Sequence, residues 1–328
     1  MNPFPEVTCI GEAIVDFVAM RKGTTLSETG GFLKLAGGAP ANVAVGIAKL
    51  GGRSAFAGRV GDDSFGRFLC SELNRYRVDT SGVRFDREHK TRLAFVSFTK
   101  SGDRDFEFWE KSPADEQLRP EDVDGARVSG SKIVALSSFL LLREPARDSF
   151  FAIARKLRHR GTLVAFDPNL RLSLWKSRGE AKRVVMRALR FSQILRMNDE
   201  EAAFLTGEPN VGRAAGLLMS MGPSLVVVTL GKAGCYFRTK AHAGRVPGFG
   251  VKNPDTTGCG DGFYASLLFS LSRTEGETTT LSASELASIC RTANAAGALT
   301  ASHRGAIPAL PTAAMLKRFL ASGKRGNA

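Results

Sequence analysis

Short apolar runs rich in β-branched residues alternate with longer amphipathic segments along most of the chain. In the longer segments apolar residues return every three or four positions, as at Val43, Ile47 and Leu50, which is the spacing of one buried helix face. Strands covered on both faces read as unbroken apolar runs, and their alternation with helices is typical of a parallel sheet. The pattern therefore predicts an α/β fold with a doubly wound, mostly parallel sheet as its core. The runs interpreted as buried strands are 7–10, 133–136, 163–166, 194–197 and 225–229.

Two segments, 17–36 and 92–110, depart from this alternation and are typical of short strands joined by glycine-bearing turns. Because both interrupt the same rhythm, we expect them to meet as one small β-sheet lid over a site built by the core. Phe95, Phe106 and Phe108 are expected to face that site. The predicted core then comprises 1–16, 37–91 and 111–321, and the segment 322–328 is expected to be a disordered tail.

Composition adds a charge question to this picture. The 328 residues carry 46 Lys and Arg against 32 Asp and Glu, a formal net charge of +14. Such a charge would suit a polyanion, but the basic residues are scattered through helical segments such as 155–160 and 182–190, without interleaved aromatic residues or a recognition-helix motif. We interpret them as a solvated basic surface and expect no nucleic-acid partner.

The chain shows no apolar run long enough to span a membrane, and its first residues lack the pattern of a signal peptide. We therefore expect a cytoplasmic protein with no membrane partner. Its five cysteines are widely spaced and form no CxxC pair, which predicts free thiols without disulfides or zinc.

The strongest chemical motif is the string Asp-Thr-Thr-Gly-Cys-Gly-Asp at 255–261, which leads directly into an amphipathic run. A glycine-rich loop lets backbone N–H groups converge on an anion, and the start of a helix adds the positive end of its dipole. Asp261 in the first helical turn could accept the proton of an attacking hydroxyl. The alternative is a tight turn with an acidic residue at a helix start.

Several polar residues stand where ligands usually bind. The paired glycines at 37–38 allow close approach to the backbone, and Asn42 offers a donor and an acceptor to hydroxyls, although it could equally cap a helix. Asp16 follows the first strand and has the alternative of a solvated loop residue. Asn169 and Arg171 follow the predicted strand 163–166, at the end where open α/β sheets bind ligands, and Arg171 has the alternative of a surface residue.

Two further motifs are compatible with a nucleotide. Thr229, Gly231 and Gly234 form a strand-to-turn element that could pass under a nucleotide, although a lone motif of this kind is weak. Asn198 and Glu201 match a capping box ahead of an apolar helix, a reading that needs no function. Neither a Walker A motif nor the catalytic motifs of protein kinases occur, so those two nucleotide folds do not compete.

These strings together resemble one family. The segment 255–261 is similar to the C-terminal signature of the PfkB, or ribokinase-like, carbohydrate kinases. The segments 37–44 and 61–66 resemble its N-terminal signature in the fructokinase form, and 305–311 resembles the end of fructokinases. The resemblance implies a doubly wound core with a β lid, and transfer of the γ-phosphoryl group of ATP to a sugar hydroxyl, most closely that of D-fructose to give fructose 6-phosphate.

Other outcomes stay open. The same motifs fit kinases of 2-keto-3-deoxygluconate, of an aminoimidazole riboside or of other sugars and nucleosides, and a kinase-like scaffold without catalysis. At the end of the predicted lid segment 92–110, Glu110 and Lys111 stand where Arg and a small or polar residue are typical of the family. This difference leaves the identity of the sugar open. Members of the family sometimes form homodimers through the lid.

The resemblance also implies roles for single residues, with Mg²⁺ as cofactor beside ATP and a monovalent cation, usually K⁺. Asp261 corresponds to the catalytic base, and the amides of Gly258, Cys259 and Gly260 to the anion hole. Glu201 would hold Mg²⁺ through water, and Asp255 and Thr257 would lie at the monovalent cation. The implied sugar-binding residues are Asp16, Gly37, Gly38, Asn42, Arg104, Asn169 and Arg171, and the implied ATP-binding residues are Asn198, Glu201, Thr229, Gly231, Gly234 and Asn294.

Overall fold

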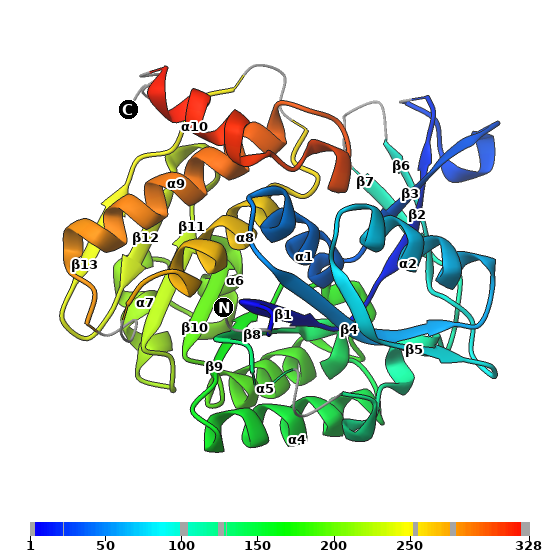
Figure 1. Ribbon diagram of the computed structural model, residues 1–328, viewed down its shortest axis with the longest axis horizontal. Coiled ribbons are helices and arrows are strands. Elements are labelled where there is room, and N and C mark those ends of the chain that lie inside the picture. Colours follow the sequence, from blue (N-terminus) through cyan, green and yellow to red (C-terminus); the bar gives the residue numbers. More distant parts are fainter. Residues whose placement is uncertain are drawn as a thin grey trace.

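A computed structural model of the chain describes residues 4–21, 23–98, 104–123, 128, 130–251, 255–275 and 280–322, without the side chains of 98 and 104–106. Within these residues a nine-stranded sheet forms the centre of the molecule, and all of its strands run parallel except β12 and β13 (Figure 1). In order across the sheet the strands are β13 (Ala243–Val246), β12 (Cys235–Arg238), β11 (Leu225–Thr229), β10 (Ile194–Asn198), β9 (Leu163–Asp167), β8 (Ile133–Ser137), β1 (Val7–Ile10), β4 (Ser54–Gly61) and β5 (Asp79–Asp86).

Helices cover both faces of this sheet and divide its apolar side chains into two clusters. Val227 of β11 faces one cluster and its neighbour Val228 faces the other, as expected for a strand buried on both sides. The helices of the first face are α1 (Ala39–Lys49), α2 (Ser64–Arg75), α8 (Cys259–Ser272) and α9 (Ala283–Ala301), with α10 (Ala313–Ala321) packed on α9. The helices of the second face are α4 (Ala146–His159), α5 (Arg178–Leu189), α6 (Asp199–Thr206) and α7 (Val211–Met219).

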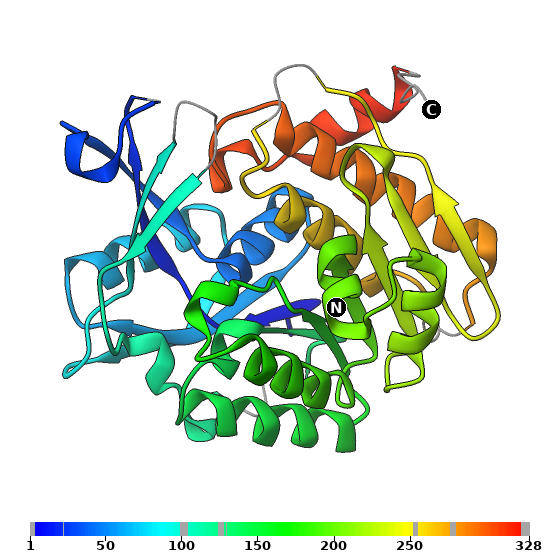
Figure 2. The ribbon, with the colours of Figure 1, turned by 180° about the vertical axis from the view of Figure 1, so that it is seen from behind.

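A second, four-stranded sheet projects from one side of the core (Figures 1 and 2). Its order is β3 (Phe32–Gly37), β2 (Ile14–Ala19), β6 (Leu93–Phe98) and β7 (Arg104–Phe108). The two segments predicted to form a lid thus supply strands to one sheet, and their exact boundaries stay a prediction.

Phe95 of the small sheet faces away from the side that the sequence-based expectation gave it, whereas the side chain of Phe106 lies outside the described part of the structure. Phe95 stacks on Phe17 at 5.1 Å, and Phe17 meets Phe65 of α2 at 5.8 Å, so Phe95 lies on the face packed against α2. Val18 and Val96 point the opposite way and line a cavity. The reason is the two-residue period of a strand, which places Phe95 and Val96 on opposite faces.

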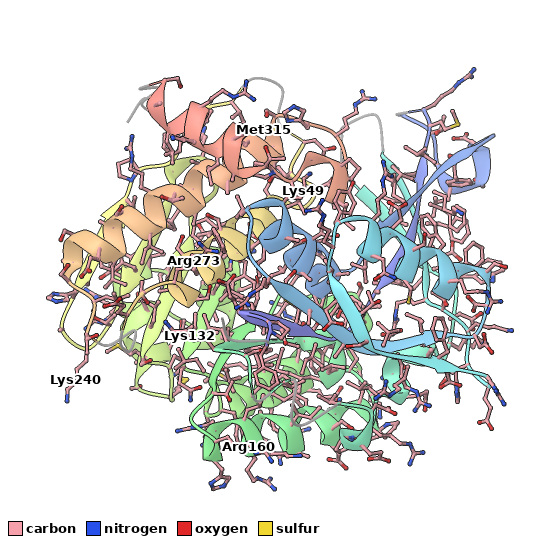
Figure 3. The ribbon with its side chains drawn as sticks, viewed as in Figure 1. Lys49, Lys132, Arg160, Lys240, Arg273 and Met315 are labelled. Atoms are coloured by element: carbon pink, nitrogen blue, oxygen red, sulfur yellow. The ribbon has the colours of Figure 1, made fainter. Side chains whose placement is uncertain are left out.

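The fold class predicted from the alternating pattern is confirmed, and each predicted buried strand coincides with β1, β8, β9, β10 or β11 to within one residue. The basic segments 155–160 and 182–190 belong largely to α4 and α5 and carry exposed basic side chains. Figure 3 shows Arg160, after α4, and Lys240, in the β12–β13 turn, at the outer surface. All five cysteines are free thiols. Within the described ranges, no helix is both long and apolar enough to cross a bilayer.

Candidate active site

Polar residues gather at the carboxyl edge of the large sheet. Strand order reverses between β1 and β8, because β1 leads to β4 and β5 on one side while β8 leads to β9, β10 and β11 on the other. Open α/β sheets bind ligands in the crevice at such a reversal. Ser137 and Asp167 end β8 and β9, and together with Asn169 and Asp261 they line a small cavity there.

The 255–261 loop is fixed by its own side chains. One carboxylate oxygen of Asp255 accepts hydrogen bonds from the N–H and the hydroxyl of Thr257, at 3.0 and 2.6 Å, and the other accepts from the N–H of Gly305 at 3.3 Å. Gly258 has a φ of +72°, and a Cβ there would lie 3.0 Å from the Cα of Ala306. This position therefore requires glycine.

The loop presents backbone donors at the start of α8. Within the described residues, no acceptor is hydrogen-bonded to the N–H of Gly258, Gly260 or Asp261, while the N–H of Cys259 reaches the oxygen of Thr256 at 3.4 Å. The first N–H groups of a helix have no partner inside the helix and carry the positive end of its dipole. The arrangement is suited to an anion.

Asp261 sits in the first turn of α8 and accepts a hydrogen bond from Asn42 Nδ2 at 2.7 Å. Burial raises the pKa of Asp261 to about 6; the nearby Asp167 acts in the same direction, while the Asn42 hydrogen bond and the Arg196 and Arg171 charges oppose it. The side chain remains partly exposed toward the cavity. At neutral pH it is an ionised carboxylate that can accept a proton.

Asn42 is 5% exposed, and within the described structure its Oδ1 has no hydrogen-bond partner. Buried polar atoms are nearly always satisfied by protein, water or ligand. A ligand hydroxyl beside Asp261 would supply the missing donor, so the pair offers a base and an acceptor to one hydroxyl-bearing molecule.

Glu12 is a site residue that sequence reasoning missed. It is 1% exposed, and its carboxyl accepts the N–H of Ala39 at 3.2 Å and the hydroxyl of Ser137 at 2.5 Å. Burial raises the pKa of Glu12 to about 8. Gly38 has a φ of +97°, and a Cβ at this position would lie 2.6 Å from the carbonyl oxygen of Glu12. Glu12 thus ties β1 to the glycine pair and to the end of β8, and its only sequence signal is its place in the same short string as Asp16.

Asp16 lies in β2 of the small sheet, not in a solvated loop. A Cβ on Gly37 would lie 2.2 Å from its Oδ2, so the glycine admits this carboxylate. Asp16 faces a cavity of about 410 Å³ between the small sheet and the 255–261 loop. The walls of this cavity are Asp16, Val18, Ala19, Met20, Leu33, Leu35, Ala36 and Val96 on the small sheet and Asp255, Thr257, Arg304, Gly305, Ala306 and Pro308 opposite.

The motif after β9 reaches the same edge. Asn169 adopts a left-handed φ of +36°, and its N–H donates to Asp167 Oδ1 at 3.1 Å. Arg171 is exposed, and its charge acts on Asp261. Arg104 begins β7, but its side chain lies outside the described part of the structure, so its predicted contact with sugar stays a prediction.

The capping interpretation of Asn198 and Glu201 is confirmed. Asn198 Oδ1 accepts from the N–H of Glu201 at 2.7 Å, and Glu201 Oε2 accepts from the N–H of Asn198 at 3.0 Å. Glu201 Oε1 accepts from the N–H of Leu170 at 2.6 Å. Both carboxylate oxygens therefore hold backbone groups, which fits an outer role toward a metal better than direct ligation.

The turn after β11 and helix α9 meet. Gly234 has a φ of +97°, and a Cβ there would lie 2.0 Å from the oxygen of Val246. Asn294 Nδ2 donates to that same oxygen and to the oxygen of Pro247, each at 3.1 Å. Gly231 also adopts a positive φ, +54°. Gly234 and Asn294, two of the predicted nucleotide-binding residues, thus both lie against Val246, and their contact with a nucleotide stays a prediction.

Arg196 of β10 is the second residue that the sequence did not single out. Its guanidinium donates to Asp167 Oδ2 at 2.7 Å and to Thr229 Oγ1 at 2.9 Å. The available signal was an arginine inside an otherwise apolar strand. Among the described side chains, no group of three His, Cys, Asp or Glu residues is arranged to hold a metal ion.

Comparisons with known proteins agree on one family. The family model described as "pfkB family carbohydrate kinase" matches residues 5–313. The chain is 39% identical over 315 residues to "Probable fructokinase-2" of Arabidopsis thaliana, covering 96% of this chain and 95% of that protein.

Solved structures give the same result. A fructokinase from Vibrio cholerae O395, in its fructose, ADP and calcium ion bound form, matches with a TM-score of 0.85 and 36% identity over 96% of this chain and 98% of its own. The aminoimidazole riboside kinase of Salmonella enterica, complexed with aminoimidazole riboside and an ATP analogue, matches with a TM-score of 0.81 and 31% identity over 96% of this chain and 99% of its own. On these matches and this site, the chain belongs to the pfkB family of carbohydrate kinases and is a sugar phosphotransferase.

Proposed function

We propose that this protein is an ATP-dependent fructokinase that converts D-fructose to fructose 6-phosphate. The observation that carries the proposal is the partly exposed Asp261 in the first turn of α8, beside Asn42, whose Oδ1 has no partner among the described residues. The fructokinase likeness over nearly the whole chain favours fructose among sugars.

In the proposed reaction Asp261 accepts the proton of the sugar hydroxyl as its oxygen attacks the γ-phosphorus. The bond from the γ-phosphorus to the bridging oxygen breaks, and ADP leaves. The amides of Gly258, Cys259 and Gly260 stabilise the charge that develops on the transferred group. Burial suits this task because it raises the pKa of Asp261 to about 6, high enough to accept a proton and low enough to stay ionised at neutral pH.

We assign the acceptor sugar to the side of Asp16, Gly37, Gly38 and Asn42, with Asn169, Arg171 and Arg104 completing that side. The cavity beside Asp16 supports this assignment, since the small sheet gives it a mostly apolar wall and Asp255, Thr257 and Arg304 supply polar groups opposite. The small sheet is proposed to act as the lid of the sugar site.

ATP is assigned to the wall formed by Thr229, Gly231, Gly234 and Asn294, with Asn198 and Glu201 beside its phosphates. Glu201 would hold Mg²⁺ through water, and the ion would neutralise charge on the phosphate oxygens. A monovalent cation, K⁺, is assigned to Asp255 and Thr257, which are hydrogen-bonded to each other in the loop.

The proposed compartment is the cytoplasm, where ATP is available.

A homodimer through the small sheet is the proposed assembly, because Met20 and Leu33 are 72% and 55% exposed there. Light scattering of the purified protein, compared with a Leu33→Lys variant, tests the assembly.

The decisive experiment measures ADP formation with fructose against glucose, ribose, 2-keto-3-deoxygluconate and aminoimidazole riboside. We expect the highest kcat/KM for fructose, and a product that phosphoglucose isomerase accepts. A higher kcat/KM for another acceptor would reassign the substrate. The absence of acceptor-dependent ADP formation with every compound would contradict the proposed activity.

A further inference from the structure

Arg196 lies near the carboxyl edge of the large sheet, between the ends of β9 and β11. It leaves β10 and contacts the last residues of both neighbouring strands, Asp167 of β9 and Thr229 of β11. Its side chain is only 11% exposed, and its Nε has no partner among the described residues. A buried arginine with an unused donor in a ligand-binding crevice calls for a functional explanation.

The guanidinium also supports the anion-binding loop directly. A Cβ placed on Gly260 would lie 2.9 Å from Arg196 Nη1 and 3.0 Å from Nη2. Arg196 therefore fills the space that a side chain at 260 would take, and it lies against the backbone of the loop. One turn further along α8, the ring centroid of Phe263 lies 5.8 Å from the guanidinium carbon.

Of the cations near Asp261, Arg196 most strongly favours its ionised form. Asp167 disfavours ionisation of Asp261, while Arg196 and Arg171 favour it. Arg171 is exposed, so solvent screens its effect. Tyr264, one turn along α8, stays protonated because burial raises its pKa. The remaining neighbour, Asn42 on α1, is uncharged.

We propose that Arg196 is a positioning residue for phosphoryl transfer: its guanidinium braces the backbone at Gly260, next to the base Asp261, and neutralises the carboxylate of Asp167. This inference rests on the proposed function, in which Asp261 is the base. The planar fork of arginine serves a carboxylate, a hydroxyl and the loop at once, which the single ammonium of lysine does not.

Loss of this cation would leave Asp167 and Asp261 uncompensated beside bound triphosphate, and two nearby carboxylates disfavour each other's ionisation. Arg196→Met and Arg196→Lys test the role. The matched control is Arg238→Met in β12, because Arg238 is also partly buried with an unpaired Nε in the described structure but contacts the oxygen of Gly212, remote from the loop.

Two measurements are needed. The first is the pH dependence of kcat/KM for fructose, and the second is the titration of the Asp261 carboxyl carbon by NMR, assigned with Asp261→Asn. In Arg196→Met we expect kcat to fall on the order of a hundredfold and both titrations to move up by about one pH unit. For Arg196→Lys we expect kcat and both titrations to lie between those of Arg196→Met and wild type. For Arg238→Met we expect both to match wild type.

A uniform loss of rate with an unmoved titration of Asp261 would reduce Arg196 to a structural role and overturn the proposal. Should Arg196→Met fail to fold, Arg196→Lys decides by the same two titrations. If the wild type phosphorylates no sugar, the proposed function fails, and the NMR titration still reports whether Arg196 controls Asp261.

Discussion

The proposed nucleotide side and the proposed acceptor side of the site differ in how their polar groups are satisfied. On the nucleotide side, Glu201, Thr229 and Asn294 direct their side chains to protein partners: backbone groups for Glu201 and Asn294, and Arg196 together with the oxygen of Met197 for Thr229. On the proposed acceptor side, Asn42 Oδ1 and the N–H groups of Gly258, Gly260 and Asp261 have no partner among the described residues. In the proposed assignment, the unsatisfied groups of Asn42 and of the 255–261 loop are thus the ones that a ligand would complete.

The same contrast separates the two sheets. The large sheet is covered on both faces, and its strands β10 and β11 hold Arg196 and Thr229 in fixed positions. The small sheet packs one face on α2 and leaves the other, with Val18, Leu33 and Val96, on the cavity. In the proposed assignment, the catalytic groups lie at the edge of the sheet that is covered on both faces, while the acceptor lies beneath the sheet that is covered on one face.

The largest effect should come from the base. We expect Asp261→Asn to lower kcat by about a hundredfold to ten-thousandfold, because an amide cannot accept the hydroxyl proton. Folding should be unchanged, since the new amide oxygen can still accept from Asn42. Steady-state kinetics and thermal unfolding check both statements, and turnover near that of wild type would remove Asp261 from the mechanism.

The two sides should respond separately to truncation. We expect Asn42→Ala and Asp16→Ala to raise KM for fructose about 5-fold to 150-fold, which corresponds to about 1–3 kcal/mol for an unpaired buried polar group. KM for ATP should change much less.

Asn294→Ala is the matched variant on the other side. It frees the oxygens of Val246 and Pro247 and should raise KM for ATP more than KM for fructose. The reverse pattern in either set of variants would mean that the assignment of the two sides is exchanged.

The pH dependence should identify which buried carboxyl limits the reaction. The pKa of Asp261 is raised to about 6 and a base must be ionised, so kcat/KM should fall about tenfold per pH unit as the pH drops below about 6. Glu12, whose pKa is raised to about 8, would instead produce a change at alkaline pH. A profile that is flat through pH 6 and bends near 8 would point to Glu12.

Sequence reasoning predicted the strands of the core and the 255–261 loop because both depend on local pattern: apolar runs, and glycines before a helix. It missed Arg196 because its partners, Asp167 and Thr229, lie on different strands and only the parallel pairing brings them together. Glu12 was missed for the same reason, since Ala39 and Ser137 are remote in sequence.

The orientation of Phe95 differs from these cases. It was within reach of sequence reasoning, because strand alternation separates Phe95 from Val96 and only one of them can face the cavity. Burial by α2 decided which one. Local pattern thus gives the two faces, and tertiary packing selects between them.

The smallest expected effect is a change in hydrogen exchange on the small sheet. Transfer to a sugar must exclude water that would otherwise accept the phosphoryl group, so fructose should draw Val18, Leu33 and Val96 toward the loop and close the cavity. The outer strand β3 should gain most protection, because β2 is already paired on both sides.

The base of the small sheet and the core strand β11 are internal references for this measurement. Arg92, just before β6, is buried and pairs with Asp115 and Glu116 at 2.9 and 2.8 Å, which fixes the points where the chain enters and leaves the sheet. Exchange there and in β11 should hardly change, and Asp261→Asn should still show the protection, because closure needs sugar and not chemistry. If saturating fructose leaves β3 unprotected while the enzyme turns over, another element covers the sugar, and the small sheet belongs with the rigid part of the molecule.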